Sequence, residues 1–266
     1  MDWSKIKTIF ILTFLILDVY LLFQFMKIRD ANKFEVTTEV KFEDKLKADE
    51  IEYNDLPKAP IKDQYLSARP KMFMKADITK LKGKPAAFKE PSATLQIVLE
   101  KPFQLSSKFE PAELSAFLKE NVLFGEQYQF WEKDDKNNTI TYFQQYENFT
   151  LFQNTKGMII FNLNAEHQIV SYQQTYLEGI EILTAKEEIL APLKAIETLH
   201  QKGVLKPKSK ITKIELGYST LIQLGASSQV LAPTWRFVVN DKESLFVNAF
   251  EGQIIQFNSD EKDKVE

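Results

Sequence analysis

One long apolar run near the N-terminus constrains this chain more than any other feature. From Ile9 to Met26, only four residues are not plainly apolar: Thr13, Asp18, Tyr20 and Gln24. An α-helix of 18 residues is about 27 Å long, and the preceding turn, from Ile6, extends it toward the thickness of a bilayer core. A helix packed in a protein core normally shows a polar face, whereas this run is apolar almost all round. Residues 6–26 are therefore predicted to cross a membrane.

The same run differs from a cleaved signal peptide. Signal peptides have a shorter apolar region that ends in small residues of the Ala-x-Ala kind. Here the run ends in bulky residues, Phe23-Gln24-Phe25-Met26-Lys27. The sequence thus favours an uncleaved anchor.

Charged residues flank both ends of the span, so the positive-inside rule gives little bias in orientation. Lys5 and Lys7 lie at one end, and Lys27 and Arg29 lie at the other. The layout indicates the orientation instead, because a single early span followed by a large body is typical of a signal-anchor. We expect residues 1–5 to form a short cytoplasmic tail and the C-terminal body to be extracytoplasmic.

The polar residues of the span point in two directions. At 100° per residue, Asp18 lies on one face, while Thr13, Tyr20 and Gln24 lie together on another. Asp18 is near the middle of the span, where an aspartate costs about 2.5–3.5 kcal/mol on insertion scales. One interpretation is that both faces contact other transmembrane helices, since a lone carboxylate in lipid needs a partner. The alternative is a protonated aspartate that the membrane tolerates.

Positive and negative charges are nearly balanced over the whole chain. The 34 Lys and Arg residues almost offset 37 Asp and Glu residues, which gives a net charge of −3, and the two signs are interspersed. Such a chain lacks the strong positive field that nucleic-acid binding requires, so we expect no nucleic-acid partner. The absence of cysteine excludes disulfides, thiol catalysis and cysteine-ligated metal centres.

After the span, the pattern predicts a linker and then an α+β body. Residues 27–60 are charged and contain two prolines, so we expect a membrane-proximal linker with one short strand at residues 35–42. Two similar units are expected at residues 61–155 and 156–258, each an antiparallel sheet with a helix on one face. Residues 259–266 are expected to form a disordered tail.

Each expected unit contains one amphipathic helix followed by a β-meander. The first helix is predicted to begin at Pro111, because proline is favoured at the first helical position. The second is predicted to begin at Thr184, where Glu187 lies three residues on, as in a capping box. The similar order of residues around Trp131 and around Trp235 indicates an internal duplication; the alternative is that any two meanders look alike at this level.

No motif for catalysis or cofactor binding is present in the sequence. The two histidines, His167 and His200, are not at metal-ligand spacing. Gly-x-Ser-x-Gly, Ser-x-x-Lys, His-Glu-x-x-His and glycine-rich phosphate loops are all missing. The many acidic residues could include a glycosidase-like pair of catalytic carboxylates, but the sequence does not favour any one pair over the others. We therefore expect no enzyme activity, no catalytic residue, no metal and no cofactor.

The two ends of the chain resemble one known family. The opening MDWSKIKTIFI at residues 1–11, with FLILDVYLL at residues 14–22 and Gln24-Phe25, resembles the start of the YycI (WalI) family. The segments PTWRF at residues 233–237 and FVNAFEGQII at residues 246–255 resemble the end of that family, and also the last hairpin of PepSY-type domains. The N-terminal match is the more specific of the two.

This resemblance implies a function, partners and a fold. Members of the family are membrane-anchored, non-enzymatic regulators of the WalK/WalR (YycG/YycF) two-component system, which controls cell-wall metabolism in low-GC Gram-positive bacteria. They act with a related anchored protein, YycH, and contact the sensor histidine kinase largely through transmembrane helices. The implied fold is two similar α+β units of the PepSY/YycH-like kind, without catalytic residues.

Two other classes of function stay open from the sequence. An anchored extracytoplasmic wall-active enzyme or protease inhibitor with a PepSY-like fold would need a pocket of grouped ionisable residues. A scaffold that binds envelope ligands would have to use the helix as its anchor, because no cysteine is available for lipidation. A structure can discriminate among these classes by showing whether such a pocket exists.

Overall fold

The computed structural model describes residues 3–31, 35–54, 56–57, 61–79, 81, 84–85, 91–223 and 228–257. The chain divides into two compact units. One combines Met1–Glu52 with Lys206–Ser209, and we call it the helical unit. The other combines Tyr53–Leu205 with Lys210–Glu266, and we call it the two-sheet unit. The expected tail, residues 259–266, lies outside the described residues.

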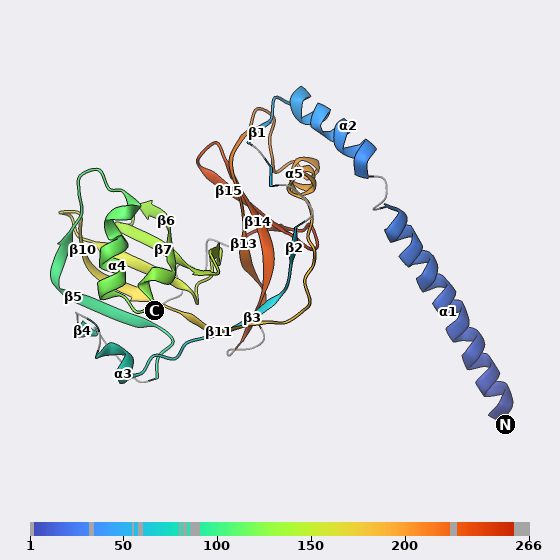
Figure 1. The fold of residues 1–266 in the computed structure, drawn as a ribbon, viewed down its shortest axis with the longest axis horizontal. Coiled ribbons are helices and arrows are strands. Elements are labelled where there is room, and N and C mark those ends of the chain that lie inside the picture. Colours follow the sequence, from blue (N-terminus) through green and yellow to red (C-terminus); the bar gives the residue numbers. More distant parts are fainter. Residues whose placement is uncertain are drawn as a thin grey trace. The chain divides into compact units, whose positions relative to one another are not determined.

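The helical unit consists mainly of two helices (Figure 1). α1, Trp3–Ala31, is one continuous helix that contains the whole predicted span. α2, Glu35–Ala48, follows it, and the N–H of Ile51 then donates to the carbonyl of Leu46 at 2.8 Å. A long run without proline or glycine accounts for the continuity of α1, since nothing in it interrupts the backbone hydrogen bonds.

The strand expected at residues 35–42 is wrong, because these residues belong to α2. Apolar residues separated by four positions fit both an alternating strand and a helical face, so this short stretch was ambiguous. Phe42 and Leu46, which are four apart, are both buried, and this spacing is that of a helix.

The first sheet of the two-sheet unit is antiparallel. Its strands are β4 (Lys84–Pro85), β5 (Leu95–Gln104), β6 (Tyr128–Asp134), β7 (Thr139–Tyr146), β8 (Phe149–Thr150), β9 (Met158–Leu163) and β10 (Gln168–Gln174). They are ordered β4-β5-β10-β9-β7-β6, and β8 pairs with β7. A short helix, α3 (Lys75–Ile78), precedes β4 along the chain.

α4, Ser115–Asn121, covers one face of the first sheet. It follows a 3-10 turn that begins at Pro111, as predicted, with Glu110 as its N-cap. Phe117 and Leu118 of α4 belong to one buried cluster with apolar residues from five strands, among them Ile97 on β5 and Phe161 on β9. Burying a side chain of this size contributes about 1.5–3 kcal/mol, so this cluster fixes the helix on the sheet.

The second sheet is also antiparallel and surrounds the long strand β14. Its strands are β1 (Glu52–Tyr53), β3 (Leu66–Pro70), β11 (Leu177–Ile182), β13 (Lys210–Gln223), β14 (Gln229–Val239), β15 (Glu243–Asn248) and β16 (Ile254–Ile255). Along one edge β14 pairs with β13; along the other it pairs first with β3 and then with β15. The change of partner falls at Pro233, which has no N–H to donate to a strand. A separate two-stranded sheet joins β2 (Lys62–Asp63) to β12 (Glu187–Glu188).

α5, Pro192–Gln201, is the helix of the second sheet, and it begins eight residues later than the expected Thr184. Glu187, the expected capping residue, instead lies in β12. Pro192 occupies the first turn, the place where its missing N–H costs least. Leu193, Ile196 and Leu199 form its buried face.

The α+β class is confirmed, with two antiparallel sheets that each carry one helix. The expected boundary between residues 155 and 156 does not separate these sheets, however. β9 and β10 follow that boundary but pair within the first sheet, and β3 precedes it but pairs with β11 and β14 of the second sheet. In both sheets a helix is followed by a meander, β6-β7-β9-β10 or β13-β14-β15-β16, which is the order that suggested duplication.

Several buried contacts join the two sheets. Leu151 forms a parallel bridge with Tyr218, and the N–H of Phe152 donates to the carbonyl of Tyr218 at 2.7 Å. Trp131 stacks on Phe246 with ring centroids 6.3 Å apart. Because these contacts use main-chain hydrogen bonds and large aromatic side chains, the two sheets behave as one packed body.

A buried carboxylate provides a test of this packing. The Tyr218 hydroxyl donates to Asp63 Oδ1 at 2.6 Å, and burial raises the pKa of Tyr218, so the phenol stays protonated. Tyr218→Phe should lower the free energy of unfolding by about 1.5–3 kcal/mol, because the Asp63 carboxylate loses a donor. Urea unfolding of wild type, Tyr218→Phe, Asp63→Asn and the double variant would measure this. Strictly additive effects would contradict a direct interaction.

Candidate functional site

The surface of α1 is the first candidate functional surface. Ile6–Met26 has a mean hydropathy of 2.3 and is not buried within the structure. Phe14 and Leu21 are each more than half exposed. The helix is long and apolar enough to cross a membrane, where lipid or other helices would cover this surface.

Three of the four predicted contact residues, Thr13, Tyr20 and Gln24, make hydrogen bonds within α1. The Thr13 hydroxyl donates to the carbonyl of Ile9 at 2.8 Å. Gln24 Nε2 donates to the Tyr20 hydroxyl at 3.1 Å, one turn away. The structure therefore brings Tyr20 and Gln24 together on one face, as the helical period predicts.

Asp18 stands apart from that face. Its position along the helix differs from that of Thr13 by five residues, or about 140° of rotation. Within the described part of the chain, its carboxylate has no hydrogen-bond or ion-pair partner, and the side chain is exposed. The structure thus separates the predicted contact residues into a hydrogen-bonded set and one free acid.

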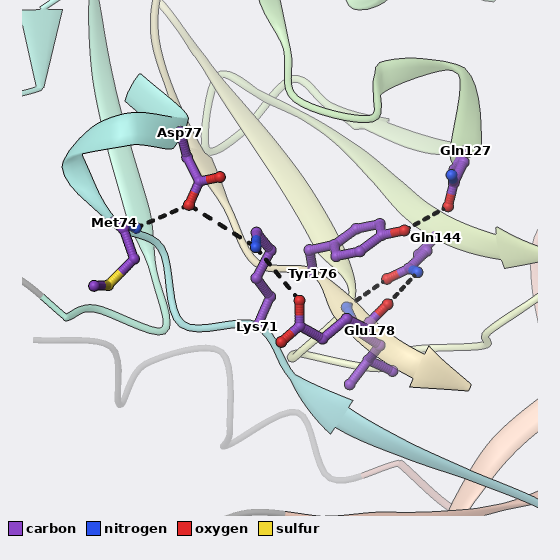
Figure 2. A network of polar contacts seen from close by, with 8 residues as sticks. Lys71, Met74, Asp77, Gln127, Gln144, Tyr176 and Glu178 are labelled. Atoms are coloured by element: carbon purple, nitrogen blue, oxygen red, sulfur yellow. Dashed lines mark hydrogen bonds and ion pairs between the residues drawn. The ribbon is translucent and has the colours of Figure 1, made fainter. Parts of the chain in front are cut away.

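The second candidate surface lies in the two-sheet unit, where the chain passes from β10 into β11 (Figure 2). Lys71 Nζ lies 3.4 Å from a carboxylate oxygen of Glu178 and 3.8 Å from one of Asp77. Asp77 in turn accepts from the N–H of Met74 at 2.9 Å, which caps α3. These ion pairs fix α3 and the segment before it against β11.

A buried glutamine of the first sheet forms hydrogen bonds with the start of β11, where the chain leaves β10 (Figure 2). Gln144 of β7 accepts from the N–H of Leu177 at 2.7 Å and donates to its carbonyl at 2.8 Å. The side-chain amide thereby takes the place of a neighbouring strand at the start of β11. The Tyr176 hydroxyl next to it donates to Gln127 at 2.8 Å, and burial raises the pKa of this tyrosine.

An open groove of about 470 Å³ borders the start of β11. Its lining includes Tyr146, Tyr176 and three carboxylates, those of Glu126, Glu147 and Glu178. Glu126 pairs with Lys119 at 2.8 Å, and Glu178 pairs with Lys71 at 3.4 Å. Since two of the three acids are paired with lysine, the groove is not a strongly negative site.

A serine and a histidine line the same small pocket of the two-sheet unit. These are Ser106 and His167, and the Ser106 hydroxyl oxygen lies 2.8 Å from a carboxylate oxygen of Glu113 and 2.9 Å from the carbonyl oxygen of Lys108, either of which can accept its single proton. The other histidine, His200, lies in the last turn of α5. Within the described ranges, no group of three or more His, Asp or Glu side chains could hold a metal ion.

Sequence reasoning missed the polar residues that join the two sheets. Gln144 is one; Asn154, whose side chain donates to Thr220 at 2.9 Å and to Gln229 at 2.7 Å, is another. Arg236 is a third: it pairs with Glu215 at 2.8 Å and lies 4.0 Å over the ring of Trp131. The only signal in the sequence was a polar residue within an apolar strand pattern. Such a residue is expected to be hydrogen-bonded when buried, but the pattern does not show which residue it bonds to.

The comparisons with known proteins give one strong match. The model of the YycI protein family matches residues 31–250. No curated protein matches the chain. Among solved structures, an uncharacterised protein from Eubacterium rectale is similar over 79% of this chain and 92% of its own, with a TM-score of 0.44 and 10% identity. The C-terminal domain of Bacillus megaterium YpeB is similar over 61% of this chain and 72% of its own, with a TM-score of 0.38 and 14% identity.

Proposed function

This chain belongs to the YycI family, and from that premise we propose that it is a non-enzymatic, membrane-anchored regulator of a WalK (YycG)-like sensor histidine kinase that controls cell-wall metabolism. The observation that carries the proposal is the family match over residues 31–250. The match adds to the resemblance of the two ends of the sequence, because it covers the body between them. The long apolar helix that precedes the matched region agrees with a membrane regulator.

We propose a single-pass topology for this regulator. α1 would place residues 1–5 in the cytoplasm and the two-sheet unit outside the membrane. The support is the layout, in which one early span precedes the whole folded body. In this arrangement a sensor kinase with its own transmembrane helices can be reached both within the bilayer and outside it.

The proposed mechanism is a shift in a kinase equilibrium. α1 would pack against transmembrane helices of the kinase and of a YycH-like partner, while the two-sheet unit would pair with the partner's extracytoplasmic domain. A regulator that binds one kinase state more tightly than another shifts the population toward that state. A coupling free energy of about 1–3 kcal/mol, typical of such linkage, corresponds to a change of about 5- to 150-fold.

A helix exchange tests the proposal. Replacing residues 6–26 with an unrelated transmembrane helix should abolish regulation of kinase autophosphorylation, because the contacts within the bilayer are lost while the anchor remains. Autophosphorylation in membranes containing the kinase and the YycH-like partner would be compared for the wild type and the chimera. Immunoblotting of the membrane fraction verifies equal amounts of both.

Intact regulation by this chimera would refute a role for the span. The complementary chimera keeps residues 6–26 and carries an unrelated folded domain in place of the two-sheet unit. If only this second protein fails to regulate the kinase, the regulatory contact lies in the two-sheet unit and not in the span. Regulation by neither the wild type nor any chimera would refute the proposed function itself.

A further inference from the structure

We propose that the Asp18 face of α1 is the face that packs against a partner's transmembrane helix, and that this helix supplies a hydrogen-bond donor or a cation at the depth of Asp18. The opposite face, with Thr13, Tyr20 and Gln24, faces lipid. This inference rests on the proposed function and specifies which surface of the helix performs it.

The polar side chains of the Thr13/Tyr20/Gln24 face form hydrogen bonds within their own helix. The Thr13 hydroxyl donates to the Ile9 carbonyl, and Gln24 donates to the Tyr20 hydroxyl. A polar side chain that is hydrogen-bonded within its own helix costs less in lipid than a free one. Gln24 also lies only two residues from the end of the span, within reach of the interfacial region.

Asp18 cannot be satisfied by hydrogen bonds within its own helix in the same way. Its carboxylate is two residues, or about 3 Å, from the midpoint of Ile6–Met26, so it lies far from either interface. The backbone N–H groups of an uninterrupted helix are already used by the helix itself. Within the described chain no side chain pairs with Asp18. The missing donor must therefore come from outside this chain.

A second copy of this chain does not supply the donor. Two copies that pair symmetrically through this face would bring Asp18 against Asp18, because a two-fold interface uses the same surface on both sides. Carboxylates have no donor when ionised, and like charges disfavour the contact. The occupant is thus a different chain, whose helix carries Lys, Arg, His, Ser, Thr, Asn or Gln facing Asp18. The proposed function names two such chains, the sensor kinase and a YycH-like partner. We assign the kinase, because a regulator shifts an equilibrium only through contacts with the chain that changes state.

The neighbours of Asp18 define the rest of the surface. Phe14, Leu21 and Phe25 lie on the same side of α1, and all three are more than half exposed. Large apolar side chains around one acid form a surface on which a helix packs while the acid fixes its depth and rotation. Such a polar contact contributes orientation and specificity as well as affinity.

Site-specific photo-crosslinking tests this assignment with matched aromatic positions. A benzophenone amino acid would be placed singly at Phe14 or Phe25 on the Asp18 face, and at Tyr20 or Phe23 on the opposite face, in the full-length chain. Membranes would contain epitope-tagged sensor kinase and the YycH-like partner. We expect kinase adducts at Phe14 and Phe25 to exceed those at Tyr20 and Phe23 by about tenfold.

Substitution of the acid then tests the chemistry. Asp18→Leu, in the Phe14 crosslinker background, should lower the yield of the kinase adduct about tenfold, whereas Phe23→Leu should leave it unchanged. Loss of anchoring does not explain such a result, because a leucine makes insertion into the membrane more favourable. Asp18→Asn keeps the shape and an acceptor oxygen, so it should retain part of the yield.

Each other outcome counts against a defined statement. Adducts that are stronger at Tyr20 and Phe23 would overturn the assignment of the face and leave the regulatory function standing. Adducts with a second copy through Phe14, or an unchanged yield with Asp18→Leu, would refute the statement that a kinase helix supplies a hydrogen-bond donor or a cation to Asp18. No kinase adduct at any position, together with intact regulation by the exchanged helix, would overturn this assignment and leave the regulatory function standing, whereas no adduct together with no regulation by the wild type would refute the proposed function.

Discussion

Replacing Gly217 with alanine should lower the melting temperature of the two-sheet unit by about 6–12 °C. A Cβ at this position would lie 2.5 Å from the carbonyl oxygen of Thr150 and 2.6 Å from the ring of Phe152. Neither neighbour can move freely, because Thr150 is paired in β8 and Phe152 is buried. The added carbon therefore has to push β13 away from the first sheet, at a cost of about 3 kcal/mol. In a domain of about 200 residues, each kcal/mol corresponds to about 2–4 °C.

A second glycine gives the control for this substitution. Gly203 has a φ of +69°, and a Cβ there would meet nothing within 4 Å. Gly203→Ala should therefore destabilise only through backbone strain, by about 1–2 kcal/mol. Differential scanning fluorimetry of the two variants, in detergent, measures both effects. A smaller shift for Gly217→Ala than for Gly203→Ala would show that β13 and β8 approach less closely than the structure indicates.

Near-UV circular dichroism provides an independent readout of the contact between the two sheets, which we call the joint. Trp131 stacks on Phe246 and lies under Arg236, so its environment depends on the approach of the two sheets. Gly217→Ala should reduce the tryptophan signal below the melting temperature, because it opens the joint. Gly203→Ala should leave the signal unchanged, because the affected backbone lies in the turn after α5.

Local signals in the sequence predicted the parts of the fold that depend on local physics. The apolar run from Ile6 to Met26 needs no partner to become a helix, and α1 contains all of it. Pro111 marked the start of the first helical segment because the fixed φ of proline suits that position. The class of two antiparallel sheets with one helix each followed from the order of such local signals.

The parts that depend on distant residues were not predictable in the same way. The strand assigned at residues 35–42 failed because a spacing of four fits two periods, and only burial of Phe42 and Leu46 decides between them. The helix start at Thr184 failed because Glu187 pairs with Asp63 across more than 120 residues. The pairing of β3 with β14 likewise joins residues 66–68 to residues 229–231, and nothing local encodes it.

The candidate site shows the same division. Asp18 was identifiable because one acid in an apolar run is conspicuous, and its distance from the Thr13/Tyr20/Gln24 face follows from the helical period alone. The sequence could not show that Gln24 bonds to Tyr20 while Asp18 has no partner among the residues that the structure describes. That difference, which depends on side-chain geometry, is the basis on which we propose that one face of α1 meets lipid and the other meets a protein.

The largest loss of stability is expected from Trp235→Ala, which should lower the free energy of unfolding by about 4–5 kcal/mol. Trp235 on β14 is 1% exposed, and its indole N–H donates to the carbonyl of Leu190 at 2.8 Å. Removing it leaves a large cavity in the core of the second sheet, which costs about 3–5 kcal/mol for an aromatic side chain. It also leaves the Leu190 carbonyl without its donor, just before α5 begins.

Trp235→Phe separates these two contributions. Phenylalanine keeps most of the buried ring but cannot donate to Leu190, so this variant should lose only about 1–3 kcal/mol. Urea unfolding followed by far-UV circular dichroism would measure all three proteins, because the signal does not depend on the tryptophan that is removed. Equal losses for the alanine and phenylalanine variants would show that the hydrogen bond, rather than the buried ring, holds the segment before α5 on the second sheet.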